Sequence, residues 1–177
     1  MAEQKLQGKR AIVTGGATGI GYGIAQRFIA EGAVVIISDI DQPGGTAAAQ
    51  KLGPNCEFVQ QDVSLPADWE HLFAVADERF SGLDIMVNVA GVTLMGTIED
   101  MDVETWDKTM GINLRSCFLG CQGAIKLMKA DGGGAIINMA SVSSFKAQPE
   151  LVAYNASKAG VDMMTKSVAL HCARSGY

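Results

Sequence analysis

The N-terminal part of the chain carries a strand, a glycine turn, a helix, a second strand and an acid, in that order. The β-branched run at residues 11–13 leads into the turn TGGATGIG at residues 14–21, and a helical stretch follows to about residue 31. The buried-type strand at 34–37 then ends at Asp39. In such a unit the backbone N–H groups and the helix N-terminus receive a pyrophosphate. A purely connecting glycine loop is the alternative, and the completeness of the order argues against it.

The glycine spacing and the acid refine this prediction. The turn reads G-x-x-x-G-x-G rather than G-x-G-x-x-G, but both patterns meet the same need for a tight turn and close backbone approach to phosphate. Asp39, about 20 residues beyond the turn, can accept hydrogen bonds from both adenosine ribose hydroxyls and would repel a 2′-phosphate. No Arg or Lys lies in the turn or within several residues after Asp39. NAD is therefore favoured over NADP.

Strand and helix patterns alternate along the whole chain. Strands are predicted near residues 10–14, 34–39, 57–60, 84–88 and 135–139, and helices near 19–31, 44–52, 66–80, 103–129 and 154–172. This order predicts an α/β fold, a Rossmann-like doubly wound parallel sheet with helices on both faces. Ligand should lie outside the carboxyl ends of the strands. Several polar side chains fall at or just after those ends and point to one shared site: Thr14, Asp39, Asp62, Asn88 and Ser141.

A tyrosine and a lysine four residues apart precede the last apolar helical run. Tyr154 and Lys158 would project from the same helix face. A cation beside a tyrosine favours the phenolate, which would suit the phenol to acid–base work. Such pairs also arise by chance on helix surfaces, so the motif gains meaning only from the segments upstream.

Taken together, these motifs resemble the classical short-chain dehydrogenase/reductase family from residue 6 to the end. The resemblance is carried by the turn at 14–21, by 62–63 and 88–91, and by Asn113, Ser141, Tyr154 and Lys158. Within the family, residues 117–122 and 136–144 look most like bacterial 3β/17β-hydroxysteroid dehydrogenases and related cyclic-alcohol dehydrogenases.

The resemblance implies four catalytic residues. Tyr154 would be the general acid–base, and Lys158 would favour its phenolate and hold the nicotinamide ribose hydroxyls. Ser141 would bond the substrate oxygen, and Asn113 would hold a water of a proton relay behind Lys158. Two nearby hydroxyls could be confused with Ser141, but the family spacing of thirteen residues before the tyrosine favours it over Ser143 and Ser144.

The resemblance also implies a set of cofactor-binding residues: Gly15, Thr18, Gly19, Ile20, Gly21, Asp39, Asp62, Val63, Asn88, Ala90, Gly91, Tyr154 and Lys158. Of these, Asp62 and Val63 would meet the adenine, and those of segment 88–91 would line the cofactor cleft. One departure is Val89, where the family usually has a second asparagine. It is expected to weaken a sheet hydrogen bond or alter cofactor affinity without removing the chemistry.

Composition agrees with one folded domain, an NAD-binding Rossmann domain over residues 1–177. Apolar residues make up 48% and charged residues 19%, and the net charge is −5. This charge gives no basic patch for nucleic acid. The first five residues form no apolar signal region, and no run approaches the ~18 apolar residues of a membrane span. We therefore expect a cytoplasmic protein without a membrane partner.

The four cysteines, at 56, 117, 121 and 172, show no C-x-x-C or finger spacing. Cys117 and Cys121 share a helix face and could in principle bind metal with a distant histidine. Buried helix-face thiols are the favoured reading, so no metal site is predicted.

Two classes of function follow. In the favoured one, the chain is an NAD-dependent oxidoreductase that interconverts a secondary alcohol and a ketone by hydride transfer, with a cyclic or steroid-like substrate. In the other, it is an NAD-binding module, or an incomplete subunit without turnover. Within the enzyme class a 3-oxoacyl-thioester reductase is the nearest rival, and Asp39 argues against its usual NADP.

Two further expectations rest on the resemblance. Family members continue into two more parallel strands and a substrate-covering loop, so the chain is expected to be incomplete at its C-terminus. Family members also pair through helices matching residues 103–129 and 154–172, so a homodimer or homotetramer is expected.

Overall fold

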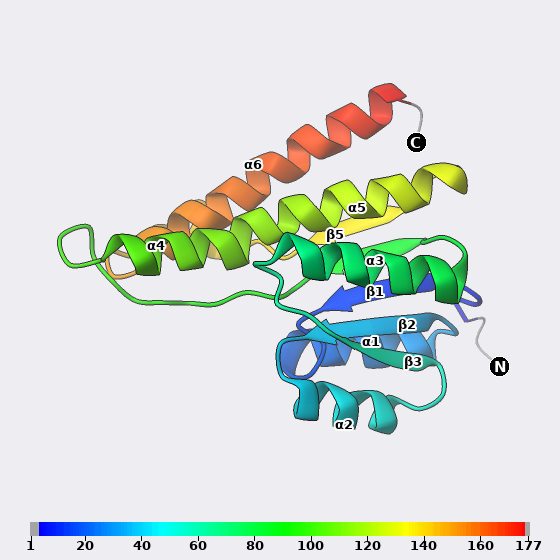
Figure 1. Ribbon diagram of the computed structural model, residues 1–177. Helices are drawn as coiled ribbons and strands as arrows, with labels where there is room; N and C mark the ends of the chain where they lie inside the picture. Colours follow the sequence, from blue (N-terminus) through cyan, green and yellow to red (C-terminus); the bar gives the residue numbers. More distant parts are fainter. Residues whose placement is uncertain (1–3, 176–177) are drawn as a thin grey trace.

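The computed structural model describes residues 4–175, which form a parallel sheet with helices on both faces (Figure 1). Five strands lie in the order β3-β2-β1-β4-β5. They are β1 (Arg10–Thr14), β2 (Val34–Asp39), β3 (Cys56–Gln60), β4 (Ile85–Asn88) and β5 (Ala135–Asn138). The chain winds outward from β1 to β3 and then returns to β4, so the strand order reverses between β1 and β4. A ligand crevice is expected at that switch point.

The helices are divided between the two faces by the right-handed crossovers of the parallel strands. They are α1 (Gly19–Ala30), α2 (Gln42–Leu52), α3 (Pro66–Phe80), α4 (Val103–Met110), the π-helical turn η1 (Gly111–Arg115), α5 (Ser116–Ala130), the 3₁₀ turn η2 (Val142–Ser144) and α6 (Val152–Ser175). Figure 1 shows α5 and α6 together, away from α1 and α2. None of the described helices is both long and apolar enough to cross a membrane.

Alternate strand residues build two separate cores. Ile12, Ile36 and Met86 pack on one face with Leu72 of α3 and Ala124 of α5. A second group packs on the opposite face with α1 and α2: Val13, Ile37, Val87, Ala25 and Ala48. Because β1 and β2 bury both faces, they read in the sequence as continuous apolar runs. The predicted doubly wound α/β fold is confirmed.

The predicted single helix at residues 103–129 was wrong in one respect, because the structure breaks it into α4, η1 and α5. α4 begins where the Asp102 side chain accepts the Thr105 backbone N–H at 2.7 Å. The π turn then inserts one residue into the helical register, a feature often found at functional sites. Two other elements begin two residues earlier than predicted, α2 at Gln42 and α6 at Val152.

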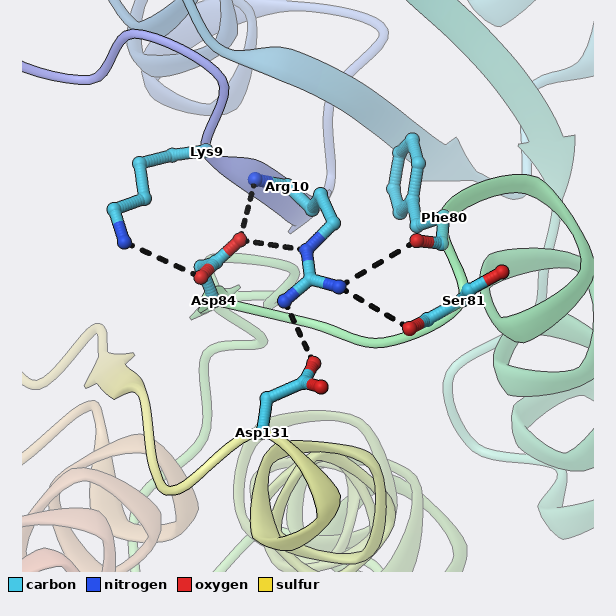
Figure 2. A network of polar contacts seen from close by, with 6 residues as sticks. All are labelled: Lys9, Arg10, Phe80, Ser81, Asp84 and Asp131. Atoms are coloured by element: carbon cyan, nitrogen blue, oxygen red, sulfur yellow. Dashed lines mark hydrogen bonds and ion pairs between the residues drawn. The ribbon is translucent and has the colours of Figure 1, made fainter.

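A group of six residues, the amino-edge network, fastens the edge of the sheet where the strands begin (Figure 2). Arg10 donates from Nε to Asp84 at 2.7 Å, from Nη2 to Asp131 at 2.7 Å and from Nη1 to the carbonyl of Ser81 at 3.2 Å. The other two members are Lys9, which pairs with Asp84, and Phe80, whose carbonyl Arg10 also meets. The network joins β1 to the segment before β4 and to the ends of α3 and α5.

The amino-edge network also sets the acidity of Asp84. Partial burial raises the pKa of Asp84, but hydrogen bonds from Arg10 and Lys9 outweigh this effect and hold the pKa at about 2, below the ordinary value of 3.8. The carboxylate is therefore stabilised by the folded state.

Candidate active site

The glycine turn is packed so tightly that side chains cannot replace its glycines. A Cβ on Gly21 would lie 2.1 Å from the carbonyl oxygen of Gly15. Gly15 itself has a φ of +66°, and a Cβ there would lie 3.1 Å from the backbone of Ala90. The first turn of α1 is thus drawn against the end of β1, while Thr18 and Gly19 at its N-terminus stay exposed. Exposed N–H groups at a helix N-terminus suit an anionic ligand.

A cleft of about 560 Å³ opens at the carboxyl edge of the sheet, at the switch point between β1 and β4. Its lining residues are Gly15, Thr18, Gly19, Ile20, Gly21, Asp39, Ile40, Gln61, Asp62, Val63, Val89, Ala90, Gly91, Val92, Lys108 and Ile112. They include most of the residues predicted to bind cofactor. A hollow of similar volume, about 550 Å³, lies over β3 and α3, but it contains neither the glycine turn nor the Tyr154 motif.

Asp39 stands at the end of β2, where it also fixes the turn. Its Oδ2 accepts the backbone N–H of Ala17 at 3.1 Å, and its Oδ1 accepts that of Asp41 at 3.2 Å. Each carboxylate oxygen has a second lone pair. The side chain can therefore hold the turn and still accept hydrogen bonds from a ligand in the cleft.

The loop that carries Asp62 and Val63 is held in place from several sides. Asp62 accepts hydrogen bonds from the backbone and hydroxyl of Ser64, at 2.9 and 2.7 Å. The Val63 carbonyl accepts the indole N–H of Trp69 at 2.8 Å, and the Ser64 carbonyl accepts Arg115 Nη2 at 2.8 Å. This side of the cleft is therefore held in place by hydrogen bonds within the protein.

Asn88 does not line the cleft, unlike the other predicted cofactor residues near it. It is buried, and its Nδ2 donates to Asn138 Oδ1 at 2.8 Å, joining the ends of β4 and β5. Thr14 makes the corresponding tie between β1 and β4, since its Oγ1 accepts the N–H groups of Val89 and Ala90 at 3.0 and 3.1 Å. Asn88 thus helps to position the ends of β4 and β5, and its contact with a cofactor stays a prediction.

Lys158 is a buried cation at the nicotinamide end expected for the cleft. Only 4% of the residue is exposed, and its Nζ donates to the Met139 carbonyl at 2.7 Å. The Nζ lies 5.7 Å from the centre of the Tyr154 ring and 3.6 Å from the place that a Cβ on Gly91 would occupy. The ammonium group therefore lies between the phenol and the loop after β4. Neither side chain is among those lining the 560 Å³ cleft itself.

Asn113 lies in the π turn and is fully buried. Its Oδ1 accepts the Val92 N–H at 2.8 Å, and its Nδ2 donates to the Val92 carbonyl at 2.8 Å and to Ser157 Oγ at 3.1 Å. Both amide hydrogens are thus used within the protein. A relay water could be held only by the remaining lone pair of Oδ1 or by main-chain groups, so the side chain first of all joins the cleft loop to α6.

The three serines after β5 have different surroundings. Ser141 caps η2, and its Oγ accepts the Ser143 N–H at 3.1 Å, which leaves the hydroxyl hydrogen able to donate. Ser144 Oγ donates to the Lys158 carbonyl at 2.9 Å, while Ser143 is buried. The geometry therefore favours Ser141 as the hydroxyl that could meet a substrate.

Sequence reasoning missed three polar residues near the cleft. Lys108 of α4 and Gln61 line it, and Arg115 of η1 holds its Ser64 wall. A search for cations near the turn along the sequence could not find Lys108, since only the fold brings α4 to the cleft. Gln61 directly precedes Asp62, which was the one signal available.

The thiols are packing groups. Cys117 and Cys121 are buried, and burial raises the pKa of Cys117 to about 11. Within residues 4–175 no group of three or more His, Cys, Asp or Glu side chains is placed to hold a metal ion.

The cleft fits a dinucleotide. Its glycine turn packs closely against the end of β1 at Gly15 and Gly21, the N-terminus of α1 is exposed, and an acid lies at the end of β2. These are the features that receive pyrophosphate and adenosine ribose in such folds. Asp39, Asp62 and the glycine turn would hold the adenosine and pyrophosphate, and Lys158 would face the opposite end.

Comparison with known proteins places the chain in a family. The sequence profile described as short chain dehydrogenase matches residues 9–176. The chain is 43% identical over 173 residues to a 3-beta-hydroxysteroid dehydrogenase of Comamonas testosteroni, covering 98% of this chain and 68% of that protein. It is also 43% identical over 176 residues to an NADP-dependent (R)-specific alcohol dehydrogenase of Lentilactobacillus kefiri, covering 98% and 70%.

A third relative is a 2,5-dichloro-2,5-cyclohexadiene-1,4-diol dehydrogenase of Sphingobium indicum, 37% identical over 169 residues, covering 94% of this chain and 68% of that protein. The chain thus spans about two thirds of the length of these relatives, all of which are dehydrogenases. A profile match over nearly the whole chain, with relatives above 30% identity, shows that the protein belongs to the short-chain dehydrogenase family of oxidoreductases.

Proposed function

We propose that the protein is an NAD-dependent oxidoreductase that interconverts secondary alcohols and ketones, with Tyr154 as the acid–base group. The observation that carries this proposal is the buried ammonium of Lys158, 5.7 Å from the Tyr154 ring and beside Gly91 at the cleft. Burying a cation is costly unless it is paired or used. A phenolate and the hydroxyls of a cofactor ribose would both repay that cost.

In the oxidation direction, the phenolate oxygen of Tyr154 takes the proton of the substrate hydroxyl. Lys158 stabilises the phenolate that is needed beforehand, and the Ser141 hydroxyl donates to the substrate oxygen and orients it. A bound nicotinamide cofactor supplies the acceptor for the hydride. In the reduction direction Tyr154 returns its proton to the carbonyl oxygen, and Asn113 keeps α6 in register with the cleft through Ser157 and Val92.

NAD is the cofactor we propose, because Asp39 lies in the cleft where it would meet the adenosine ribose. Its charge opposes a 2′-phosphate. Two observations weigh on the other side: the relative from Lentilactobacillus kefiri is NADP-dependent, and Lys108 adds one cation to the cleft wall. We give Asp39 more weight because it is held at the end of β2 by its two backbone hydrogen bonds, whereas Lys108 is exposed on α4.

The substrate we propose is a cyclic or steroid-like alcohol or ketone. Large apolar side chains are exposed near Ser141, with Val142 at 60% and Phe145 at 82%. Relatives named for hydroxysteroids and for a cyclohexadiene diol support this class. We also propose that residues 1–177 act as one domain within a homodimer or homotetramer formed through α5 and α6. Phe118 and Met163 are exposed on these helices, and light scattering would measure the assembly.

The test is a Tyr154→Phe variant, with NADH formation measured on a panel of cyclic and steroid secondary alcohols. Loss of the acid–base group should lower turnover by about 10²- to 10⁴-fold while NADH affinity stays within about twofold. Tyr22→Phe on α1, which removes a hydroxyl far from Lys158, is the matched control and should keep full activity. Equal turnover of the wild type and Tyr154→Phe would refute the mechanism. A wild type that binds NADH but oxidises nothing would favour a binding module.

A further inference from the structure

Gln61 is a buried polar residue on the cleft wall to which the mechanism gives no task. It is 1% exposed, and it is the residue between the end of β3 and Asp62. Its backbone N–H donates to the Asp39 carbonyl at 2.9 Å, which extends the β2–β3 ladder by one step. Gln61 is therefore placed between the two acids expected to meet the adenosine ribose and the adenine.

The side-chain amide of Gln61 is only half used. Its Oε1 accepts the hydroxyl of Ser38, also fully buried, at 2.7 Å, while its Nε2 is buried without a partner. A serine hydroxyl can donate or accept, so one polar atom of the amide remains unpaired whichever way the amide is turned. A buried donor without an acceptor costs free energy.

Two other side chains in the described part of the chain have an unpaired buried atom, Asn88 and Asn155. Neither lines the cleft, whereas Gln61 does. Such groups are rare in native proteins, and each calls for an explanation. Of the three unpaired atoms, only that of Gln61 belongs to a residue that borders the cleft, so a ligand there is the partner that its position offers.

We infer that Gln61 is a further binding residue for the adenosine part of the cofactor, its amide bonding an adenine ring nitrogen or a ribose oxygen. This inference rests on the proposed dinucleotide function. A hydrogen bond to the ligand would then offset the cost of burying the Gln61 amide. It follows that the residue before Asp62 contributes to affinity for adenosine and not to the chemistry at Tyr154.

The experiment measures affinities of the 177-residue chain for AMP and for nicotinamide mononucleotide by calorimetric titration. The test variant is Ser38→Ala/Gln61→Met, which removes both polar partners together and so leaves no new orphan. Ser38→Ala alone is the matched control, because it keeps the amide. Loss of one hydrogen bond should weaken AMP binding by about fivefold in the double variant. Binding of nicotinamide mononucleotide should stay unchanged, and the control should bind AMP within about twofold of wild type.

The outcomes separate this inference from the function it rests on. If wild type binds AMP and the double variant binds it equally well, Gln61 is only a strand tie and the inference is overturned. If wild type binds neither AMP nor NADH, the proposed function fails with it. Should the double variant not fold, the Gln61 side-chain amide signal of wild type decides by NMR: a shift on AMP saturation greater than that of the exposed Gln50 amide supports the contact, and no shift refutes it.

Discussion

The centre of the sheet and its β5 edge differ in how completely they are buried. In β1 and β2 the residues Ile12, Val35 and Ile37 are at most 1% exposed, with helices on both faces. In β5, by contrast, Ile137 is 44% exposed although it lies directly opposite the buried Val87 of β4. The central strands that lead to the glycine turn and to Asp39 are thus closed, while the β5 edge that leads to Ser141 is half open.

The same contrast runs along α6. Its buried residues, Ala153, Ser157, Lys158 and Val161, all lie in its first half. Farther along, Leu170 is 62% exposed, and Figure 1 shows the helix diverging from α5 toward its C-terminal end. Among the described residues, Tyr154 and Lys158 therefore lie on the more buried half of α6. Within the described residues, the core therefore shapes the strands that hold the glycine turn, whereas the β5 edge and the second half of α6 are less buried.

The largest effect should come from two isoleucines on the same face of the sheet. Replacing the fully buried Ile37 with Ala should lower the free energy of unfolding by about 2 to 5 kcal/mol. The same change at the half-exposed Ile137 should cost about 1 kcal/mol or less. Urea denaturation followed by circular dichroism measures both. Equal losses in the free energy of unfolding would contradict the contrast between the central strands and the β5 edge.

A smaller effect is expected from the amino-edge network, which ties β1 to the segment before β4 and to the ends of α3 and α5. Asp84→Asn should lower the free energy of unfolding by about 1 to 2 kcal/mol at pH 6, because it weakens charged hydrogen bonds to Arg10. The folded pKa of Asp84, about 2, lies below the ordinary value of 3.8. Its stabilisation is therefore full above about pH 4 and is lost as the pH falls toward 2.

Denaturation of wild type and Asp84→Asn across pH 2–6 should show this convergence at the acid end. The control is Asp162→Asn, which breaks an exposed i,i+4 pair with Lys166 and should change stability little at any pH. A constant gap between wild type and Asp84→Asn from pH 6 to pH 2 would show that the carboxylate charge is not what the network uses.

The smallest change in the free energy of unfolding should come from a substitution at Asp39, in the cleft. Asp39→Asn keeps an oxygen that can accept the Ala17 N–H but removes the charge that opposes a 2′-phosphate. The ratio of NAD to NADP affinity should fall by at least about tenfold, with little loss of stability. Asp41→Asn, two residues farther along, is the matched control. An unchanged ratio would remove Asp39 from the choice of cofactor.

The features that could be predicted from the sequence are those that a short stretch of residues determines. The glycine turn, the acid at Asp39 and the strand runs are short signals, and the structure places them as predicted. The π turn was missed because residues 103–129 keep helical polarity throughout. Lys108 and Arg115 reach the cleft wall only through packing of α4 and η1 against distant loops. The contact of Asn88 with Asn138 could not be predicted either, because only the pairing of β4 with β5 brings the two side chains together.

The π turn also has a consequence for how this chain can vary in length. One residue more or less in η1 would turn everything after it by about 100° and shift it by about 1.5 Å along the helix axis. Ala124 and Met128 would then leave the core that they share with α3. Asn113 would lose its two hydrogen bonds with the backbone of Val92. The length of η1 therefore fixes how α5 is oriented relative to α4. We expect insertions to be accepted in the neighbouring loops but not within η1.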